Sequence, residues 1–144
     1  MATTRLGITG PPLDYDEGYD LQRRLHRQVV AGELDGALVV CQHASVYTAG
    51  RRTQPEDLPL DGSRVVETDR GGRITWHGPG QLVAYPIVRL PEPVDVVAHV
   101  RALEQVLIDT CAAFGVEARR IEGAAAPGSV TVSATPRSAQ SASG

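Results

Sequence analysis

Two arginines, a histidine and four glycines fall within the twelve residues from Arg70 to Gln81. Glycine in a strand-rich region marks a turn, a bulge or a place where another molecule approaches the backbone, because glycine has no Cβ. Apolar runs at 65–66 and 82–88 predict a strand on each side. Pro86 cannot donate to a strand ladder, so the second strand is expected at a sheet edge or a bulge. The pattern predicts a ligand-binding segment; the alternative is a plain turn that carries surface arginines.

Neither cysteine has the surroundings of a reactive thiol, which needs a nearby cation or a helix N-terminus and some exposure. Cys41 lies in an apolar run, and Cys111 lies on the apolar stripe of a predicted helix. We therefore expect two free thiols in the core. The histidines lack the spacing of a metal site, so no zinc or other metal site is expected. They are His26, His43, His77 and His99.

The remaining sequence predicts the elements that position this segment. Apolar residues at helical spacing predict one helix over 16–31 and a second over 95–114. Short apolar runs predict strands at 37–41 and 116–121, and a loop is expected over 42–52. This alternation favours an α+β fold with a mixed sheet and flanking helices.

Composition limits the classes of function that the chain can have. The 144 residues are 42% hydrophobic, with a formal net charge of −3 and a pI near 5.8. Nucleic acids bind to basic surfaces, so no nucleic-acid partner is expected. No apolar run approaches the roughly 20 residues of a membrane span, and the N-terminus lacks the apolar core of a signal peptide. We therefore expect a cytoplasmic protein without a membrane partner.

Residues 70–81, continued by 82–87, resemble a signature of the lipoyl(octanoyl) transferases. Residues 42–51 are similar to the other N-terminal signature of that family, with Ala44 where a proline is usual. The resemblance implies the fold of the biotin and lipoate protein ligase catalytic domain, incomplete at its C-terminus. It also implies transfer of an octanoyl group, without a cofactor, from octanoyl-acyl carrier protein to a lysine of lipoyl domains. These domains occur in 2-oxoacid dehydrogenases and the glycine cleavage protein.

The resemblance also assigns a substrate-contact segment. The glycine pair lets the chain approach the acyl group, Trp76 offers an apolar wall, and His77 or the arginines bind the thioester end and the polar groups of pantetheine. Tyr85 either adds to the acyl wall or is a core residue with a satisfied hydroxyl. His43 is expected only to pack or cap at a strand end. The predicted substrate-binding residues are Arg70, Gly71, Gly72, Arg73, Ile74, Thr75, Trp76 and His77.

Other acyl-binding and nucleotide-binding motifs do not fit. A P-loop requires Gly-Lys-Ser/Thr, and this sequence has no lysine, because all fourteen basic residues are arginines. A dinucleotide-binding turn opens a helix, whereas Gly78-Pro79-Gly80 leads into an apolar run typical of a strand. Biotin and lipoate ligases need a lysine and nucleotide-binding loops, so the missing lysine argues against that activity as well.

The resemblance runs to about Gly123, which predicts one domain over 1–123. Residues 124–144 are small and polar without periodicity and are expected to be disordered. The family's catalytic cysteine and lysine lie downstream and have no counterpart here, so no catalytic residue is predicted and activity is expected to be impaired. One alternative is a non-catalytic remnant that binds acyl groups or acyl carrier protein. Another is a non-functional product whose tail is read out of frame, because family-like codons read one base late reproduce parts of 124–144.

Overall fold

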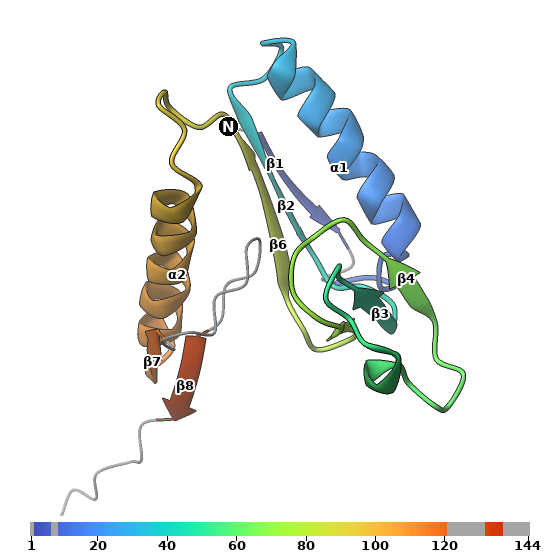
Figure 1. The fold of residues 1–144 in the computed structure, drawn as a ribbon. Coiled ribbons are helices and arrows are strands. Elements are labelled where there is room, and N and C mark those ends of the chain that lie inside the picture. The colour runs from blue at the N-terminus through green and yellow to red at the C-terminus, as the bar shows by residue number, and fades with distance from the viewer. Residues whose placement is uncertain (1, 7–8, 121–131, 137–144) are drawn as a thin grey trace, which may run out of the picture. The chain divides into compact units, whose positions relative to one another are not determined.

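The computed structural model describes residues 2–6, 9–120 and 132–136. It contains two compact units: one holds the described residues up to Asp69 together with 73–91, and the other holds 70–72 together with the described residues from Glu92 onward. The predicted α+β class and mixed strand pairing are confirmed. The elements, drawn in Figure 1, are β1 (Ala2–Leu6), α1 (Tyr15–Val30), β2 (Gly36–Cys41), β3 (Val46–Ala49), the 3-10 helix η1 (Pro55–Asp57), β4 (Val65–Glu67), β5 (Thr75–His77), β6 (Val83–Val88), α2 (Val96–Ala113), β7 (Val116–Arg120) and β8 (Val132–Pro136).

Helix α1 has a chemical signal at each end. The Asp14 carboxylate is the N-cap and accepts a hydrogen bond from the Asp16 N–H at 2.9 Å. Gly32 lies just beyond the C-terminus with φ of +77°, a conformation that favours glycine. The helix packs on β2 and β6 (Figure 1). Val29 is buried, whereas the arginines of the helix are exposed. The predicted amphipathic helix is confirmed to within one residue at each end.

The sheet on which α1 packs has the strand order β1-β2-β6. Strand β2 runs parallel to β1 and antiparallel to β6, with Val39 opposite Tyr85. Ala37, Val39 and Cys41 are buried on one face of β2, which places these small side chains at the centre of the core. Strand β6 contains Pro86 and lies at the edge of this sheet, as predicted. Strand β1 was not predicted.

A second small sheet has the order β4-β3-β5. Strand β3 pairs in parallel with β4 and antiparallel with β5, so that Val46 lies opposite His77 and Tyr47 opposite Trp76. The prediction of a loop over 42–52 is wrong, because β3 lies within it. Strand β5 lies inside the glycine-rich segment, where the sequence indicated no strand. Both strands are too short for a clear periodic signal and are defined by their pairing with each other.

The second unit contains helix α2, which begins after the N-cap Asp95 and ends before Gly115, as predicted. Its apolar stripe is less covered than predicted, since Phe114 is 82% exposed. Cys111, expected in the core, is half-buried and free. The buried residue of α2 is instead the acidic Glu104.

The Glu104 carboxylate is satisfied by two guanidinium groups. Arg101, one turn earlier on α2, donates to it at 3.1 Å, and Arg120 at the end of β7 donates to it at 2.9 Å. A buried carboxylate is stable only when it is paired and hydrogen-bonded. This triad therefore fastens β7 to α2.

Strand β8 pairs antiparallel with β7, with Val116 opposite Pro136. Residues 132–136 fall within the tail that is expected to be disordered, and the structure describes them as a strand held by a backbone ladder. Residues 121–131 and 137–144 lie outside the described residues.

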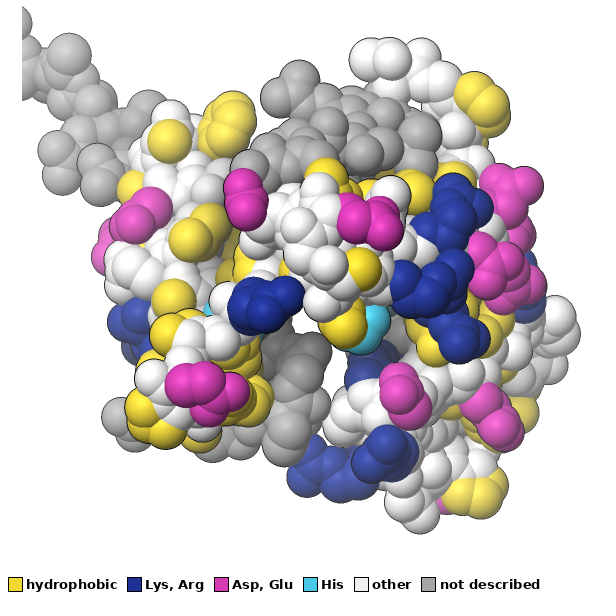
Figure 2. All heavy atoms as spheres, turned by 90° about the horizontal axis from the view of Figure 1, so that it is seen from above, with side chains coloured by type: hydrophobic (Ala, Val, Ile, Leu, Met, Phe, Trp, Pro, Cys, Tyr) yellow, Lys and Arg dark blue, Asp and Glu magenta, His cyan; other side chains and the backbone are white. Residues whose placement is uncertain are grey.

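Charged side chains of both signs are interspersed on the face of the molecule that Figure 2 shows. Across residues 2–6, 9–120 and 132–136, no helix combines the length and the apolar character needed to cross a membrane.

Candidate functional site

The eight predicted substrate-binding residues do not all lie in one unit. Arg70–Gly72 belong to the second unit, whereas Arg73–His77 belong to the first. Gly72 is buried and adopts φ of +83°, which is the left-handed conformation that favours glycine. The Arg73 side chain pairs with Asp57, where its Nε donates at 2.7 Å. This guanidinium holds the pKa of the Asp57 carboxyl below its usual value.

Trp76 lies on β5 and is 39% exposed as a residue. Its indole N–H donates to the Ser45 hydroxyl at 2.9 Å, which fixes the ring against the segment before β3. A Cβ added to Gly78 would lie 2.1 Å from Cζ2 of Trp76, so the ring covers the backbone at that glycine. The position of Trp76 therefore depends on glycine at 78.

Hydrogen bonds to two glutamine side chains hold the turn after β5 in place. Gln81 accepts from Nδ1 of His77 at 2.6 Å, and Gln42 at the end of β2 accepts from the Gly80 N–H at 2.8 Å. Because an amide oxygen only accepts, Nδ1 of His77 carries a hydrogen and Nε2 is its free acceptor in the neutral ring. No hydrogen-bond partner for Nε2 of His77 is found among the residues that the structure describes. The half-buried His77 is therefore oriented with one nitrogen available.

A buried histidine forms the centre of the site. His43 is fully buried directly after β2. Its Nδ1 lies 3.1 Å from the Leu13 carbonyl, and its Nε2 lies 2.9 Å from the Tyr85 hydroxyl and 3.6 Å from Sγ of Cys41. Because a carbonyl only accepts, Nδ1 carries the hydrogen, and the Tyr85 hydroxyl donates to Nε2.

These groups are held in their uncharged forms. Burial lowers the pKa of His43, and the neighbouring His77 lowers it further. Burial also raises the pKa of the Cys41 thiol and of the Tyr85 hydroxyl. At neutral pH His43, Cys41 and Tyr85 are therefore neutral hydrogen-bonding groups, and Cys41 is a core thiol, as predicted, with the surroundings of an unreactive one.

Aromatic rings from three further elements surround His43. Its ring centroid lies 5.3 Å from that of Tyr15 on α1, 5.9 Å from that of Tyr85 on β6 and 6.1 Å from that of His77 on β5. Helix α1 approaches closely at Gly18, where an added Cβ would lie 2.9 Å from Cε1 of His43. We call these residues, with Cys41, the His43 cluster.

Sequence reasoning missed the centre of this site. The prediction for His43 was packing at a strand end, and its burial fits that, but the residue also joins α1, β5 and β6. Tyr85 was expected either to add to the acyl wall or to be a core residue with a satisfied hydroxyl, and the structure shows its hydroxyl hydrogen-bonded to His43. The available signal was the spacing: Cys41 and His43 follow the buried alternation of β2 by steps of two residues.

Comparison with known proteins gives the fold and the relatives. The sequence model of the lipoyl protein ligase A/B catalytic domain matches residues 14–134. Octanoyltransferases from Salinispora arenicola and Salinispora tropica are 57% and 62% identical over 126 residues, which cover 85% of this chain and 59% of each relative. A solved lipoate-protein ligase A bound with ATP aligns with a TM-score of 0.59 at 17% identity, covering 87% of this chain and 52% of that chain. The predicted likeness to the ligase fold is confirmed.

Proposed function

The chain belongs to the family of lipoyl protein ligase A/B catalytic domains, and from this premise we propose that it supplies the acyl-binding part of an octanoyltransferase. The proposed donor is octanoyl-acyl carrier protein. The proposed acceptor is a lysine of lipoyl domains, in 2-oxoacid dehydrogenases and the glycine cleavage protein. The relatives at 57% and 62% identity, both named octanoyltransferase, support this activity over that of a ligase.

The observation that carries the proposal is the arrangement of the neutral groups His43, Cys41 and Tyr85 beside β5, which holds Trp76 and His77. An alkyl thioester has no charge, so it is bound best by neutral groups and apolar walls. Burial of roughly six methylene groups of an octanoyl chain is worth about 5 kcal/mol at about 0.8 kcal/mol each. A site built around charged side chains would lose much of this gain through desolvation.

Each group has a proposed role toward the donor. Trp76 packs against the acyl chain, and the open Nε2 of His77 accepts a hydrogen bond from an amide N–H of the arm that carries the thioester. The Tyr85 hydroxyl donates to His43 and has oxygen lone pairs left to accept another hydrogen bond. Arg70, Gly71 and Gly72 belong to the other unit and stay predicted substrate-binding residues, since glycine allows close contact.

Covalent transfer requires an activated nucleophile and a base. The sequence has no lysine, and the Cys41 thiol is fully buried with a raised pKa. Loss of general acid–base help alone typically costs ~10²–10⁴-fold in rate. We therefore propose that this chain by itself binds the acyl donor and transfers it poorly. The same observations favour a second candidate, a non-catalytic acyl-binding protein.

Incubation with octanoyl-acyl carrier protein and a lipoyl domain separates these functions, with intact-mass spectrometry of every component. An octanoylated lipoyl domain supports the enzyme, whereas saturable binding without it supports the binder. An octanoyl thioester on Cys41 or Cys111 contradicts the proposal that these thiols are inert. Absence of both binding and cooperative unfolding supports a non-functional product.

Variants assign the binding to this site. Trp76→Ala is expected to weaken binding of octanoyl-pantetheine at least 10-fold, because it removes the acyl wall. Leu60→Ala is the matched control, since Leu60 is apolar and fully exposed but lies in another segment. Equal affinities of the two variants in folded samples would refute the placement of the acyl chain.

A further inference from the structure

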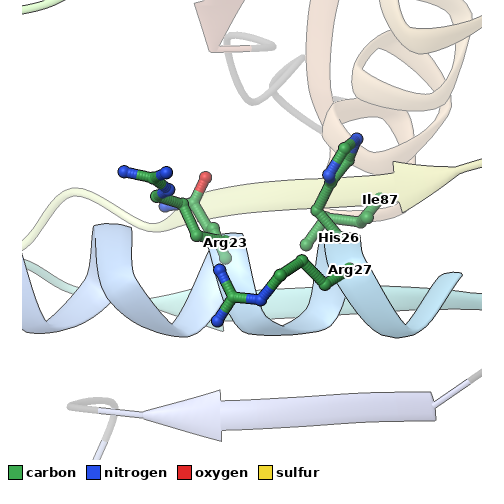
Figure 3. Close-up of a pocket in the computed structure, with 5 residues that line it drawn as sticks. Arg23, His26, Arg27 and Ile87 are labelled. Carbon is green, nitrogen blue, oxygen red and sulfur yellow. The ribbon is translucent and has the colours of Figure 1, made fainter. Parts of the chain in front are cut away.

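A groove between α1 and the edge strand β6 takes no part in the site described so far. Four of its lining residues come from α1 and the fifth, Ile87, comes from β6. Figure 3 labels Arg23, His26 and Arg27 on α1 and Ile87 on β6. Its cavity volume is about 310 Å³. This volume is at the lower end of the ~300–1,000 Å³ range of small-molecule sites, so it suits one extended ligand arm better than a protein surface. The lining residues are Gln22, Arg23, His26, Arg27 and Ile87.

The groove lies further along the same two elements, α1 and β6, that contribute residues to the His43 cluster. On β6, Tyr85 of the cluster and Ile87 of the groove are two residues apart, which places them on the same face about 7 Å apart. On α1, Gly18 contacts the cluster, and Gln22, one turn further on, donates to the Gly18 carbonyl at 3.3 Å. His26 lies one more turn along the same line of the helix. The groove is therefore one to two helical turns along α1 from the cluster.

The groove is cationic. Arg23 and Arg27 are four residues apart, so their exposed guanidinium groups lie on one side of α1 and repel each other. No carboxylate lies within salt-bridge distance of either one in the described part of the chain. Arg23 does contact the Tyr19 ring, with Cζ 5.9 Å from the ring centroid. A phosphate group between the two arginines would relieve their repulsion and accept the paired hydrogen bonds that guanidinium groups donate.

We propose that this groove binds the phosphate-bearing arm of the acyl donor. The phosphodiester lies between Arg23 and Arg27, the arm runs past Ile87, and the thioester reaches the His43 cluster. Arg27 lies nine residues beyond Gly18, which corresponds to about 14 Å along the helix axis, so the arm is bound in an extended form. This inference rests on the proposed function, because it assigns the same acyl donor to the groove and to the His43 cluster.

Calorimetric titration of the chain tests the groove with two ligands, octanoyl-pantetheine and octanoyl-4′-phosphopantetheine, which differ only in the phosphate. For the unchanged chain we expect the phosphorylated ligand to bind at least 10-fold more tightly. The double variant R23Q/R27Q should reduce this ratio to below about 2. The control is R24Q, because Arg24 is an exposed arginine of the same helix that does not line the groove.

The outcomes separate the two proposals. Equal affinity for both ligands, or a phosphate effect that R23Q/R27Q leaves intact, overturns the groove and leaves the proposed function standing. Absence of binding by either octanoyl ligand refutes the proposed function. Competition by a polyglutamate peptide without any phosphate effect would assign the groove to an acidic protein partner and would also overturn the inference. Thermal unfolding of R23Q/R27Q within a few degrees of R24Q shows that the variants are folded.

Discussion

Replacement of Tyr85 by phenylalanine removes a single oxygen atom and tests the hydrogen-bonding of the His43 cluster. The Tyr85 hydroxyl is the donor to Nε2 of His43 at 2.9 Å, and the nearest substitute is the Cys41 thiol at 3.6 Å, which is a weak donor. The variant therefore leaves a buried nitrogen without a good partner. Such a group costs about 1–3 kcal/mol in the free energy of unfolding. For a chain of this size that corresponds to a fall in Tm of roughly 4–12 °C.

Urea unfolding followed by circular dichroism gives the free energy directly. Tyr47→Phe is the matched control, because Tyr47 is a half-buried tyrosine of β3 whose hydroxyl has no hydrogen-bond partner among the described residues. The control should change the free energy of unfolding by less than about 0.5 kcal/mol. A Tyr85→Phe variant as stable as this control would refute the assignment of donor and acceptor at His43.

Three further predictions concern stability. The pKa of His43 is lowered from 6.5 in the folded state, so the unfolded state binds more protons below that pH. The free energy of unfolding should therefore fall as the pH drops below 6.5, by at most ~1.4 kcal/mol per pH unit. Urea titrations at several pH values should show that His43→Gln loses this slope. Gly78→Ala places a Cβ against Trp76, the single tryptophan, so the tryptophan fluorescence should shift and the free energy of unfolding should fall by about 1–3 kcal/mol. The control is Gly10→Ala, where the added Cβ meets open space, and it should change neither the fluorescence nor the stability. Glu104→Gln removes the carboxylate that Arg101 and Arg120 share, and thermal unfolding should show a free energy of unfolding lower by about 1–2 kcal/mol. A change below about 0.3 kcal/mol would contradict the role of Glu104 in holding β7 against α2.

The sequence predicted the elements whose signal is local. Helix α1 has an apolar repeat and a glycine stop, and α2 has a capping aspartate and a glycine stop, so both were predicted within a residue or so of their ends. Strands β2, β6 and β7 were predicted from apolar runs bounded by turn residues. Strands β3 and β5 were missed because each is only three or four residues long and exists through pairing with the other.

The predicted substrate-binding segment stays a prediction, and the residues around His43 show why sequence alone gives an incomplete site. Trp76 and His77 of the segment lie on β5, in the same unit as His43 and Tyr85. The cluster itself joins residues 30 and 42 positions apart in sequence, and such contacts leave no local pattern. A histidine just beyond the end of a strand therefore gave only the signal of a packed or capping side chain.

Binding of an octanoyl thioester beside Trp76 is the central claim, and fluorescence titration tests it most directly, because the chain has a single tryptophan. Octanoyl-pantetheine should change the Trp76 emission saturably and should bind at least 100-fold more tightly than pantetheine, because burial of the alkyl chain supplies most of the affinity. An emission that does not respond in the folded chain, or equal affinity for the two ligands, would contradict the account.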